Sequence, residues 1–282
     1  MVSAVFRARR ARCQRGRGRL APATNRFPAS GVAAYLPQAR VEAAVHAELE
    51  ALFQSCPTLE PGYVRDILGL DGAQAEKVDR ITGGIHRDEV ELLASVVDGV
   101  DPATSVEVGL GYGFSALAIG LSGQRDRAGR RHIVMDPHQT SYWRGRGLAH
   151  LDAAGLSAMI EFHEAPSHRV LPLLEARGER VDFAFIDGWH TFDYVFTDFF
   201  FVDKLLRPGG VVMFDDADWP SVRPVLRFAI TNLGYRVHAT LPEKAPRSPI
   251  DEELGLEGSC IAIRKPRTET ARAIFHHVSF TG

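Results

Sequence analysis

Between residues 105 and 265 the chain alternates short apolar runs with longer stretches of helical periodicity. The apolar runs have the length of buried strands and occupy 105–109, 132–136, 159–163, 181–187 and 211–216. The helical stretches follow them in turn, at 114–122, 141–154, 167–177, 192–206 and 219–233. Apolar strands that alternate with helices predict an α/β domain built from βαβ units, with a parallel sheet covered on both faces.

Two last apolar runs, 235–240 and 259–265, have no helical pattern between them. We therefore expect the final strand to be antiparallel and the proline- and acid-rich linker 241–258 to be a surface loop. Helical patterns also precede the first strand, at 41–53, after Pro61 and at 82–97. The chain is thus divided into a disordered tail (1–35), an N-terminal helical extension (36–80), the α/β domain (81–265) and a C-terminal tail (266–282).

Charge is unevenly distributed along the 282 residues. Nine of the 33 basic residues, all arginines, and none of the 35 acidic residues lie in the first 41 positions. Acids therefore outnumber bases in the rest of the chain, which argues against nucleic acid as a partner. The arginine-rich start is interpreted as a disordered tail, with a transit peptide or an extension without a role as alternatives.

Hydrophobicity and cysteine content indicate the compartment. No run of eighteen apolar residues is present, so neither a transmembrane helix nor a membrane partner is expected. The three cysteines are far apart and odd in number, which predicts no disulfide framework and no zinc site. A reducing cytoplasm is the expected location.

The first strand runs into a loop with glycine at every second position. Glu107 lies in the strand two residues before Gly109, and Gly109, Gly111 and Gly113 lead into the next helix. Residues without a Cβ let the backbone approach a ligand, and the helix start offers free N–H groups. The dinucleotide fingerprint G-x-G-x-x-G does not fit, because Phe114 stands where its third glycine is required.

Asp136 ends the second strand. A carboxylate in this place can accept hydrogen bonds from both hydroxyls of a ribose. The alternative is a turn or helix-capping aspartate, which the following Pro137 would favour.

Three more aspartates end the fourth and fifth strands. Asp187 follows the fourth, and Asp215 and Asp216 follow the fifth. Carboxyl ends of parallel strands meet at the ligand-binding edge of a sheet, where these charges would repel one another. A divalent cation such as Mg²⁺ would relieve that repulsion. Alternatively, Asp187 belongs to a turn, and Asp216 and Asp218 cap the next helix.

Asp187 continues into Gly188-Trp189-His190. A neutral imidazole can take up a proton near pH 7, so His190 is a candidate base. It could instead cap the next helix or be a partly buried polar residue. Trp189 fits either core packing or the lining of a cofactor pocket.

The glycine loop with its preceding glutamate, followed by an acid after the next strand, resembles class I S-adenosylmethionine-dependent methyltransferases over roughly 82–264. The resemblance implies a Rossmann-like fold, with a seven-stranded, mostly parallel sheet, an antiparallel edge strand and N-terminal helices. It places Glu107 near the methionine amine, Asp136 at the ribose and Ser167 in the adenine-contacting segment. The full implied cofactor-binding set is Glu107, Gly109, Gly111, Gly113, Ser115, Asp136, Ser167, Asp187 and Trp189.

The aspartates add a narrower resemblance. Asp187, Asp215 and Asp216 match the metal-binding positions of the catechol and caffeoyl-CoA type O-methyltransferases, and His190 stands where those enzymes have a catalytic lysine. Bacterial small-molecule O-methyltransferases with an Asp-Gly-x-His segment are also similar. That similarity makes His86 a second candidate base.

The resulting hypothesis is transfer of a methyl group to a hydroxyl of a small molecule, such as a phenol, a sugar or a secondary metabolite. His190 and Asp187 would act in catalysis, with assistance from a divalent metal. The alternatives are a metal-independent methyltransferase with a histidine base, a nicotinamide-dependent oxidoreductase and a non-catalytic cofactor-binding module. The helices before Gly83 could supply a homodimer surface.

Overall fold

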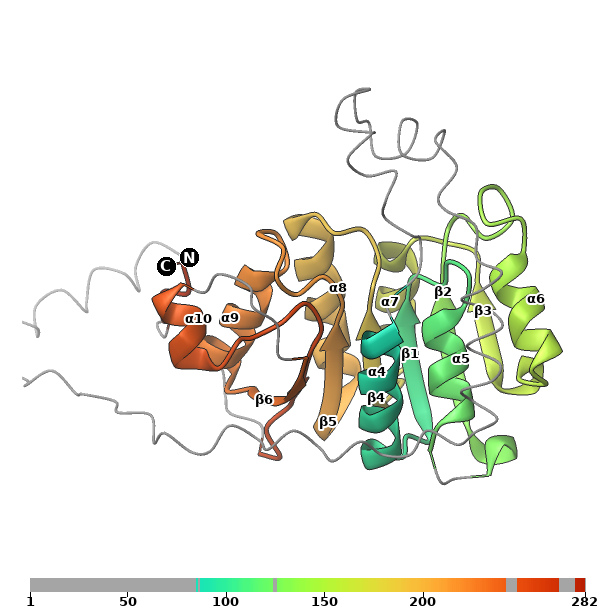
Figure 1. Cartoon of the computed structure of the whole chain (residues 1–282), viewed down its shortest axis with the longest axis horizontal. Coiled ribbons are helices and arrows are strands. Elements are labelled where there is room, and N and C mark those ends of the chain that lie inside the picture. Colours follow the sequence, from blue (N-terminus) through green and yellow to red (C-terminus); the bar gives the residue numbers. More distant parts are fainter. Residues whose placement is uncertain (1–84, 86, 124–125, 242–247, 269–276, 282) are drawn as a thin grey trace, which may run out of the picture. The chain divides into compact units, whose positions relative to one another are not determined.

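The computed structural model describes residues 85, 87–123, 126–241, 248–268 and 277–281. The expected N-terminal tail, the helical extension and His86 lie outside these residues. Among the described residues, a seven-stranded sheet with the order β3-β2-β1-β4-β5-β7-β6 forms the centre of the domain (Figure 1). Its strands are β1 (Thr104–Val108), β2 (Arg131–Met135), β3 (Ile160–His163), β4 (Val181–Ile186), β5 (Leu206–Phe214), β6 (Arg236–Thr240) and β7 (Ile261–Arg264).

The strand directions agree with the sequence pattern. β1 to β5 are mutually parallel, and β7 runs antiparallel to both β5 and β6. The expected mostly parallel sheet with a final antiparallel strand is therefore confirmed. The antiparallel strand lies one position inside the edge, because β6 pairs only with β7.

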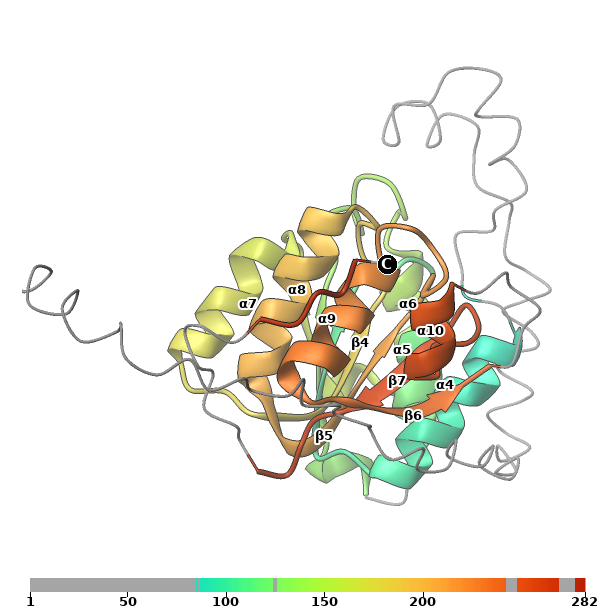
Figure 2. The same ribbon diagram turned by 90° about the vertical axis from the view of Figure 1, so that its left-hand side faces the viewer.

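Helices cover both faces of the sheet, as Figure 2 shows. They are α4 (Arg87–Val100), α5 (Phe114–Leu121), α6 (Arg146–Ala153), α7 (Ser167–Ala176), α8 (Phe192–Leu205), α9 (Arg223–Leu233) and α10 (Pro249–Leu254). One apolar cluster joins α4, α5 and α6 to the sheet, and a second joins α7, α8 and α9 to its other face. In the described part of the chain, no helix is both long and apolar enough to cross a membrane.

The two clusters follow from the alternation of side chains along each strand. In β4, Phe183 and Phe185 belong to the cluster under α4 and α5, whereas Ala184 and Ile186 belong to the opposite one. All four are at most 2% exposed. A strand buried on both faces carries an unbroken apolar run, which explains the pattern in the sequence.

Several elements differ from their expected bounds: β5 begins at Leu206 and not at 211, and α9 begins at Arg223 and not at 219. Two further differences have a local cause. The linker before β7 contains helix α10, because Ser248 caps it, Pro249 begins it and Gly255 ends it in a left-handed conformation. The helix expected from residue 141 begins only at Arg146, because the residue before it, Gly145, has φ +71°. The interpretation of 241–258 as a loop is wrong for residues 249–254.

Part of the predicted C-terminal tail lies against α9. Asn232 exchanges hydrogen bonds with the backbone N–H and carbonyl of Val278, at 2.9 and 3.0 Å. The rings of Phe228 and Phe280 meet edge to face at 5.5 Å. These contacts attach residues 277–281 to the helical layer formed by α7, α8 and α9.

Candidate functional site

The glycine loop has the conformation that its composition demands. Gly109, Gly111 and Gly113 all have positive φ angles, between +52° and +92°. A Cβ at Gly109 would lie 2.0 Å from the carbonyl oxygen of Asp187, so a larger residue cannot fit there. The loop after β1 is therefore in direct contact with the end of β4. Gly113 caps α5 without a side-chain hydrogen bond in the described residues, so its first N–H groups can meet an anion.

Asp136 is 4% exposed and its carboxylate faces the loop. Its Oδ2 accepts hydrogen bonds from the backbone N–H groups of Leu110 and Gly111, at 3.2 and 2.9 Å. Its Oδ1 accepts from the N–H of His138 at 2.7 Å. The interpretation as a turn-capping aspartate is confirmed, and a ribose contact stays a prediction.

Glu107 lies beneath the loop and is fully buried. The hydroxyl of Ser115, in the first turn of α5, donates to its Oε1. Ser115 is itself only 3% exposed. Glu107 therefore supports the start of α5 from inside, and a contact of its own with a ligand amine stays a prediction.

Asp187, Asp215 and Asp216 come together with His190 at the ends of β4 and β5. The N–H of Asp215 donates to the carbonyl of Ile186 at 3.1 Å, so the two strand ends are aligned. The imidazole of His190 lies between two carboxylates, 3.5 Å from Asp187 Oδ1 through Nε2 and 3.5 Å from Asp216 Oδ2 through Nδ1. These distances are longer than ordinary hydrogen bonds.

Without a bound ligand, burial and mutual repulsion disfavour the charged forms of the carboxylates in this cluster. Burial, and then repulsion from Asp215 and Asp216, raises the pKa of Asp187 well above its usual value. Burial, and then repulsion from Glu89 and Asp216, does the same to the pKa of Asp215. Burial lowers the pKa of His190 to about 4, so its imidazole is neutral at pH 7 and can accept a proton.

A divalent cation fits this cluster by its chemistry. Among the described residues, no group of three His, Cys, Asp or Glu side chains is already arranged around a common point. However, Asp215 Oδ1 and His190 Nε2 are buried and have no hydrogen-bond partner in the described structure. Carboxylate oxygens that repel one another and lack donors are suitable ligands for Mg²⁺. The side chains of the three aspartates would have to turn toward such an ion.

The aromatic and cofactor candidates around the cluster have different surroundings. Trp189 is partly exposed at the end of β4. The ring of Trp219 is 40% exposed and lies 5.5 Å from that of His190. Ser167 begins α7 and is 6% exposed, and its hydroxyl is hydrogen-bonded to Asp198. Ser167 therefore supports the buried side of the site, and an adenine contact stays a prediction.

Three residues at the site were missed in the sequence. Glu89 on α4 is 5% exposed, and its carboxylate accepts a hydrogen bond from Ser259 Oγ at 2.7 Å. The carbonyl of Ser259 accepts from the N–H of Ala217, which directly follows Asp216, at 2.5 Å. Asp198 on α8 is 1% exposed and lies behind Gly188. Glu89 follows Asp88 in the first turn of α4.

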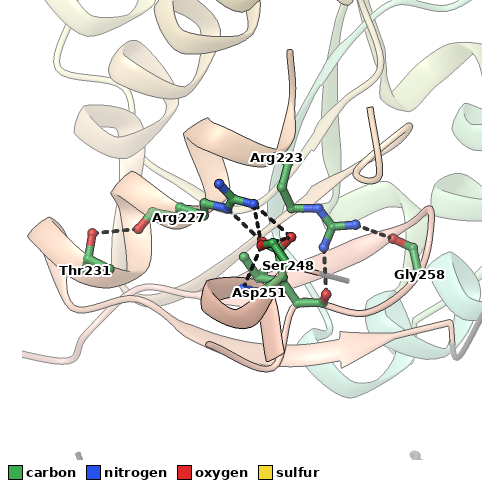
Figure 3. A network of polar contacts seen from close by, with 7 residues as sticks. Arg223, Arg227, Thr231, Ser248, Asp251 and Gly258 are labelled. Carbon is green, nitrogen blue, oxygen red and sulfur yellow. Dashed lines mark hydrogen bonds and ion pairs between the residues drawn. The ribbon is translucent and has the colours of Figure 1, made fainter. Parts of the chain in front are cut away.

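A network of polar contacts holds the chain that leads to Ser259, as Figure 3 shows. Arg227 donates to both carboxylate oxygens of Asp251 at 2.7 and 2.8 Å. Arg223 donates to the carbonyl oxygens of Leu256 and Gly258 at 2.7 and 3.3 Å. Helix α9 thus fixes α10 and the residues after it, and places Ser259 beside the end of β5.

The fold and the sequence can now be compared with known proteins. Residues 106–217 match a family described as a methyltransferase domain. The tapetum-specific methyltransferase 1 of Arabidopsis thaliana is 30% identical over 140 residues, which cover 48% of this chain and 56% of that protein. The caffeoyl-CoA O-methyltransferase 2 of Zea mays is 30% identical over 135 residues, covering 47% and 48%. The chain thus spans about half the length of these curated relatives.

Solved structures share the fold at lower identity. An O-methyltransferase from Bacillus cereus, solved with SAH, covers 73% of this chain and 96% of its own, with a TM-score of 0.50 and 18% identity. The Podospora anserina methyltransferase PaMTH1, also bound to SAH, covers 79% and 88%, with a TM-score of 0.52 and 14% identity. Residues 106–217 are thus similar in sequence to a methyltransferase domain, and the chain shares the fold of solved methyltransferases.

Proposed function

We propose that the chain is an S-adenosylmethionine-dependent O-methyltransferase that acts on a hydroxyl group of a small molecule. The observation that carries this proposal is the contact between the glycine loop and the end of β4, where a Cβ at Gly109 would meet Asp187 at 2.0 Å. A ligand on the loop would therefore lie beside the carboxylates and the neutral His190. The O-methyltransferases among the relatives support the same reaction class.

The cofactor would lie along the loop between β1 and α5. Gly109, Gly111 and Gly113 allow its close approach, and the N–H groups at the start of α5 suit its carboxylate. Asp136 holds the loop in place and, at the end of β2, would meet the ribose. When bound, S-adenosylmethionine supplies a methyl group on a sulfonium, which an oxygen can attack in line as the bond to sulfur breaks.

His190 would remove the proton of the acceptor hydroxyl. Its pKa of about 4 keeps the imidazole neutral at pH 7. Its side chain is 17% exposed but Nε2 is buried, so the cluster would have to open for a substrate to reach that nitrogen. Asp187 and Asp216, on either side of the ring, would stabilise the imidazolium that results. The half-exposed Trp219 next to His190 offers an apolar surface for the acceptor.

Asp187, Asp215 and Asp216 would hold a divalent cation. When bound, such an ion supplies a positive charge that lowers the pKa of an acceptor hydroxyl. Burial, and then mutual repulsion, raises the pKa values of Asp187 and Asp215, and a cation among these carboxylates would offset the repulsion. Among the divalent cations, all-oxygen ligands suit Mg²⁺.

A small molecule, rather than nucleic acid, is the proposed acceptor. Acidic residues outnumber basic ones after position 41, and the site itself is lined by carboxylates. Phosphate backbones would be repelled there.

The proposal is tested with the purified full chain and S-adenosylmethionine labelled on its methyl group. Label transfer to phenols, catechols and sugars is measured with Mg²⁺ and with EDTA, and binding of S-adenosylhomocysteine and NAD is compared by thermal unfolding. We expect S-adenosylhomocysteine, but not NAD, to raise the melting temperature. We also expect transfer of the label to a hydroxyl to depend on Mg²⁺. Transfer that is unchanged in EDTA would refute the metal part and leave His190 as an unassisted base. Binding of NAD instead would overturn the whole proposal.

A further inference from the structure

A chain of buried polar side chains runs beneath the glycine loop. Ser105 Oγ is 2.9 Å from His132 Nδ1, and His132 Nε2 is 2.7 Å from Glu107 Oε2. Glu107 Oε1 in turn accepts a hydrogen bond from the hydroxyl of Ser115. His132 and Glu107 are fully buried, and the two serines are at most 3% exposed.

The strand register brings these residues together. Ser105 on β1 and His132 on β2 are direct partners, and Glu107 lies two residues further along β1 on the same face. Ser115 reaches them from the first turn of α5. The chain therefore connects two strands to the start of the helix that follows the glycine loop.

The surroundings of this chain are otherwise apolar. The same face of the sheet carries Val134, Phe183 and Phe185, each fully buried. Placing a carboxylate and an imidazole among such residues costs solvation free energy, and a buried pair of this kind often stabilises a fold no better than apolar residues. A role in the neighbouring binding site explains the pair better than a role in stability.

Each ring nitrogen of His132 has one partner in this chain of hydrogen bonds. With the hydrogen on Nε2, the imidazole donates to Glu107. Nδ1 is then left to accept from the hydroxyl of Ser105. With one oxygen held by His132, Glu107 presents its other oxygen to Ser115, and the orientation of that hydroxyl is set from below.

We propose that His132 is a positioning residue for the amino-acid end of the cofactor. It orients Glu107, and Glu107 orients Ser115 and the first turn of α5, where the cofactor's carboxylate and amine would bind. This inference rests on the proposed function, because it assumes that S-adenosylmethionine occupies the loop. His132 itself touches no ligand, since its side chain is fully buried.

Two ligands separate positioning from general damage. S-adenosylhomocysteine carries the amino-acid end, whereas 5′-methylthioadenosine keeps the nucleoside and lacks that end. Both dissociation constants are measured by calorimetry on the full chain. In His132→Leu we expect the Kd of S-adenosylhomocysteine to rise about tenfold, the value of one hydrogen bond to a charged group, and that of methylthioadenosine to change less than about twofold. His132→Gln, which keeps an N–H donor, should restore most of the loss.

A matched control removes a buried hydrogen bond on the other face of the sheet. Tyr235→Phe deletes the contact of its hydroxyl with Asp203, 2.8 Å long, and should leave the ratio of the two constants unchanged. If His132→Leu does not fold, Ser105→Ala takes its place, because Ser105 can reach the ligand site only through His132. Its expected effect is a selective weakening of about two- to threefold.

Equal weakening of both ligands in His132→Leu, or an unchanged ratio in Ser105→Ala where the leucine variant does not fold, overturns the inference. A wild-type chain that binds neither ligand overturns the proposed function instead. The two failures are therefore distinguishable in one set of titrations.

Discussion

The two halves of the ligand-binding edge treat their carboxylates in opposite ways. At the ends of β1 and β2, Glu107 and Asp136 accept hydrogen bonds from a hydroxyl, an imidazole and backbone N–H groups. At the ends of β4 and β5, Asp187 and Asp215 face further carboxylates, and burial with this repulsion raises the pKa of each. Oδ1 of Asp215 has no hydrogen-bond partner in the described part of the chain.

In the first half, the chain itself supplies the hydrogen-bond donors for the carboxylates. In the second half, a ligand would have to supply the compensating positive charge or donors. In the first half, donors from β2 and from the glycine loop hold each carboxylate before any ligand arrives, so the loop is preorganised. In the second half, the folded chain retains repulsion that a proton or a cation would remove. Strongly shifted pKa values of this kind are common where chemistry takes place.

The largest effect is expected from the second half. Asp187→Ala should lower methyl transfer by about 10²–10³-fold, because it removes a charge that acts directly on the reacting groups. The Kd of S-adenosylhomocysteine should change only a few-fold, since the backbone of Asp187, and not its side chain, contacts Gly109. The same change should raise the melting temperature, because it removes one of the mutually repelling carboxylates. Turnover and thermal unfolding measure the two parts.

Asp218→Ala is the matched control for this prediction. Asp218 is exposed near the same sheet edge, so its removal should leave turnover within a few-fold of the wild type. A lower melting temperature in Asp187→Ala would contradict the prediction. It would show that the carboxylate of Asp187 stabilises the fold, as that of Asp136 does at the end of β2.

The next effect tests the first half. Asp136→Ala removes the acceptor for the N–H groups of Leu110, Gly111 and His138. Since hydrogen bonds to a charged group contribute about 1.5–3 kcal/mol, we expect the free energy of unfolding to fall by about 2–3 kcal/mol. Binding of S-adenosylhomocysteine should weaken by about 10–100-fold as the loop loosens. Calorimetry and denaturant unfolding check both values, and an unchanged stability would show that the loop does not depend on Asp136.

The hydrophobic pattern of the sequence predicted the strands and helices of the domain. Apolar runs such as 181–187 identified the strands, and the glycines at 109, 111 and 113 identified the loop after the first strand, which the structure shows with positive φ angles. Their places on the sheet followed from general rules for parallel strands. The convergence of Asp187 with Asp215 and Asp216 could therefore be predicted from the sequence.

Other parts depend on pairings that the pattern does not contain. Nothing in the sequence states that His132 lies opposite Ser105, because the register of β1 and β2 is set by packing. The position of Glu89 at the site likewise depends on the packing of α4 against β5, which the sequence pattern does not contain. Helix α10 could have been found, because Ser248, Pro249 and Gly255 are its start and stop signals.

A third prediction concerns Asp198, which lies behind the end of β4. Burial raises its pKa from 3.8 to about 7, against the effect of its hydrogen bond from Ser167. Between pH 4 and 7 the folded chain keeps a proton that the unfolded chain has released, so stability falls as pH rises and levels off above 7. Asp198→Asn lacks this dependence and should be more stable than the wild type by about 2 kcal/mol at pH 8, with little difference at pH 4.

Denaturant unfolding across this pH range measures the difference. Asp193→Asn is the control on the same helix, since Asp193 is exposed and hydrogen bonding to Thr191 lowers the pKa of its carboxyl. It should not reproduce the gain at pH 8. A difference between Asp198→Asn and the wild type that is constant from pH 4 to 8 would contradict the prediction.

The smallest effect is expected at Glu89, a residue of α4 that lies close to the carboxylates at the ends of β4 and β5. Its charge raises the pKa values of Asp187 and Asp215, while its Oε1 accepts from Ser259. Glu89→Gln keeps an acceptor for that hydroxyl and removes the charge. Without added cation, we expect the free energy of unfolding to rise by about 1 kcal/mol. With Mg²⁺, the concentration needed for half-maximal stabilisation should rise a few-fold, because one negative charge near the ion is lost.

Glu91→Gln provides the matched comparison, because Glu91 is exposed two residues further along the same helix. It removes the same charge without entering the cluster, so both measured values should stay at those of the wild type. Equal shifts in the two variants would mean that net charge, and not the position of Glu89, is responsible. A loss of stability in Glu89→Gln would contradict the prediction. It would show that Glu89, like Asp136, is a carboxylate that hydrogen bonds within the chain stabilise, and not one that is destabilised by its neighbours.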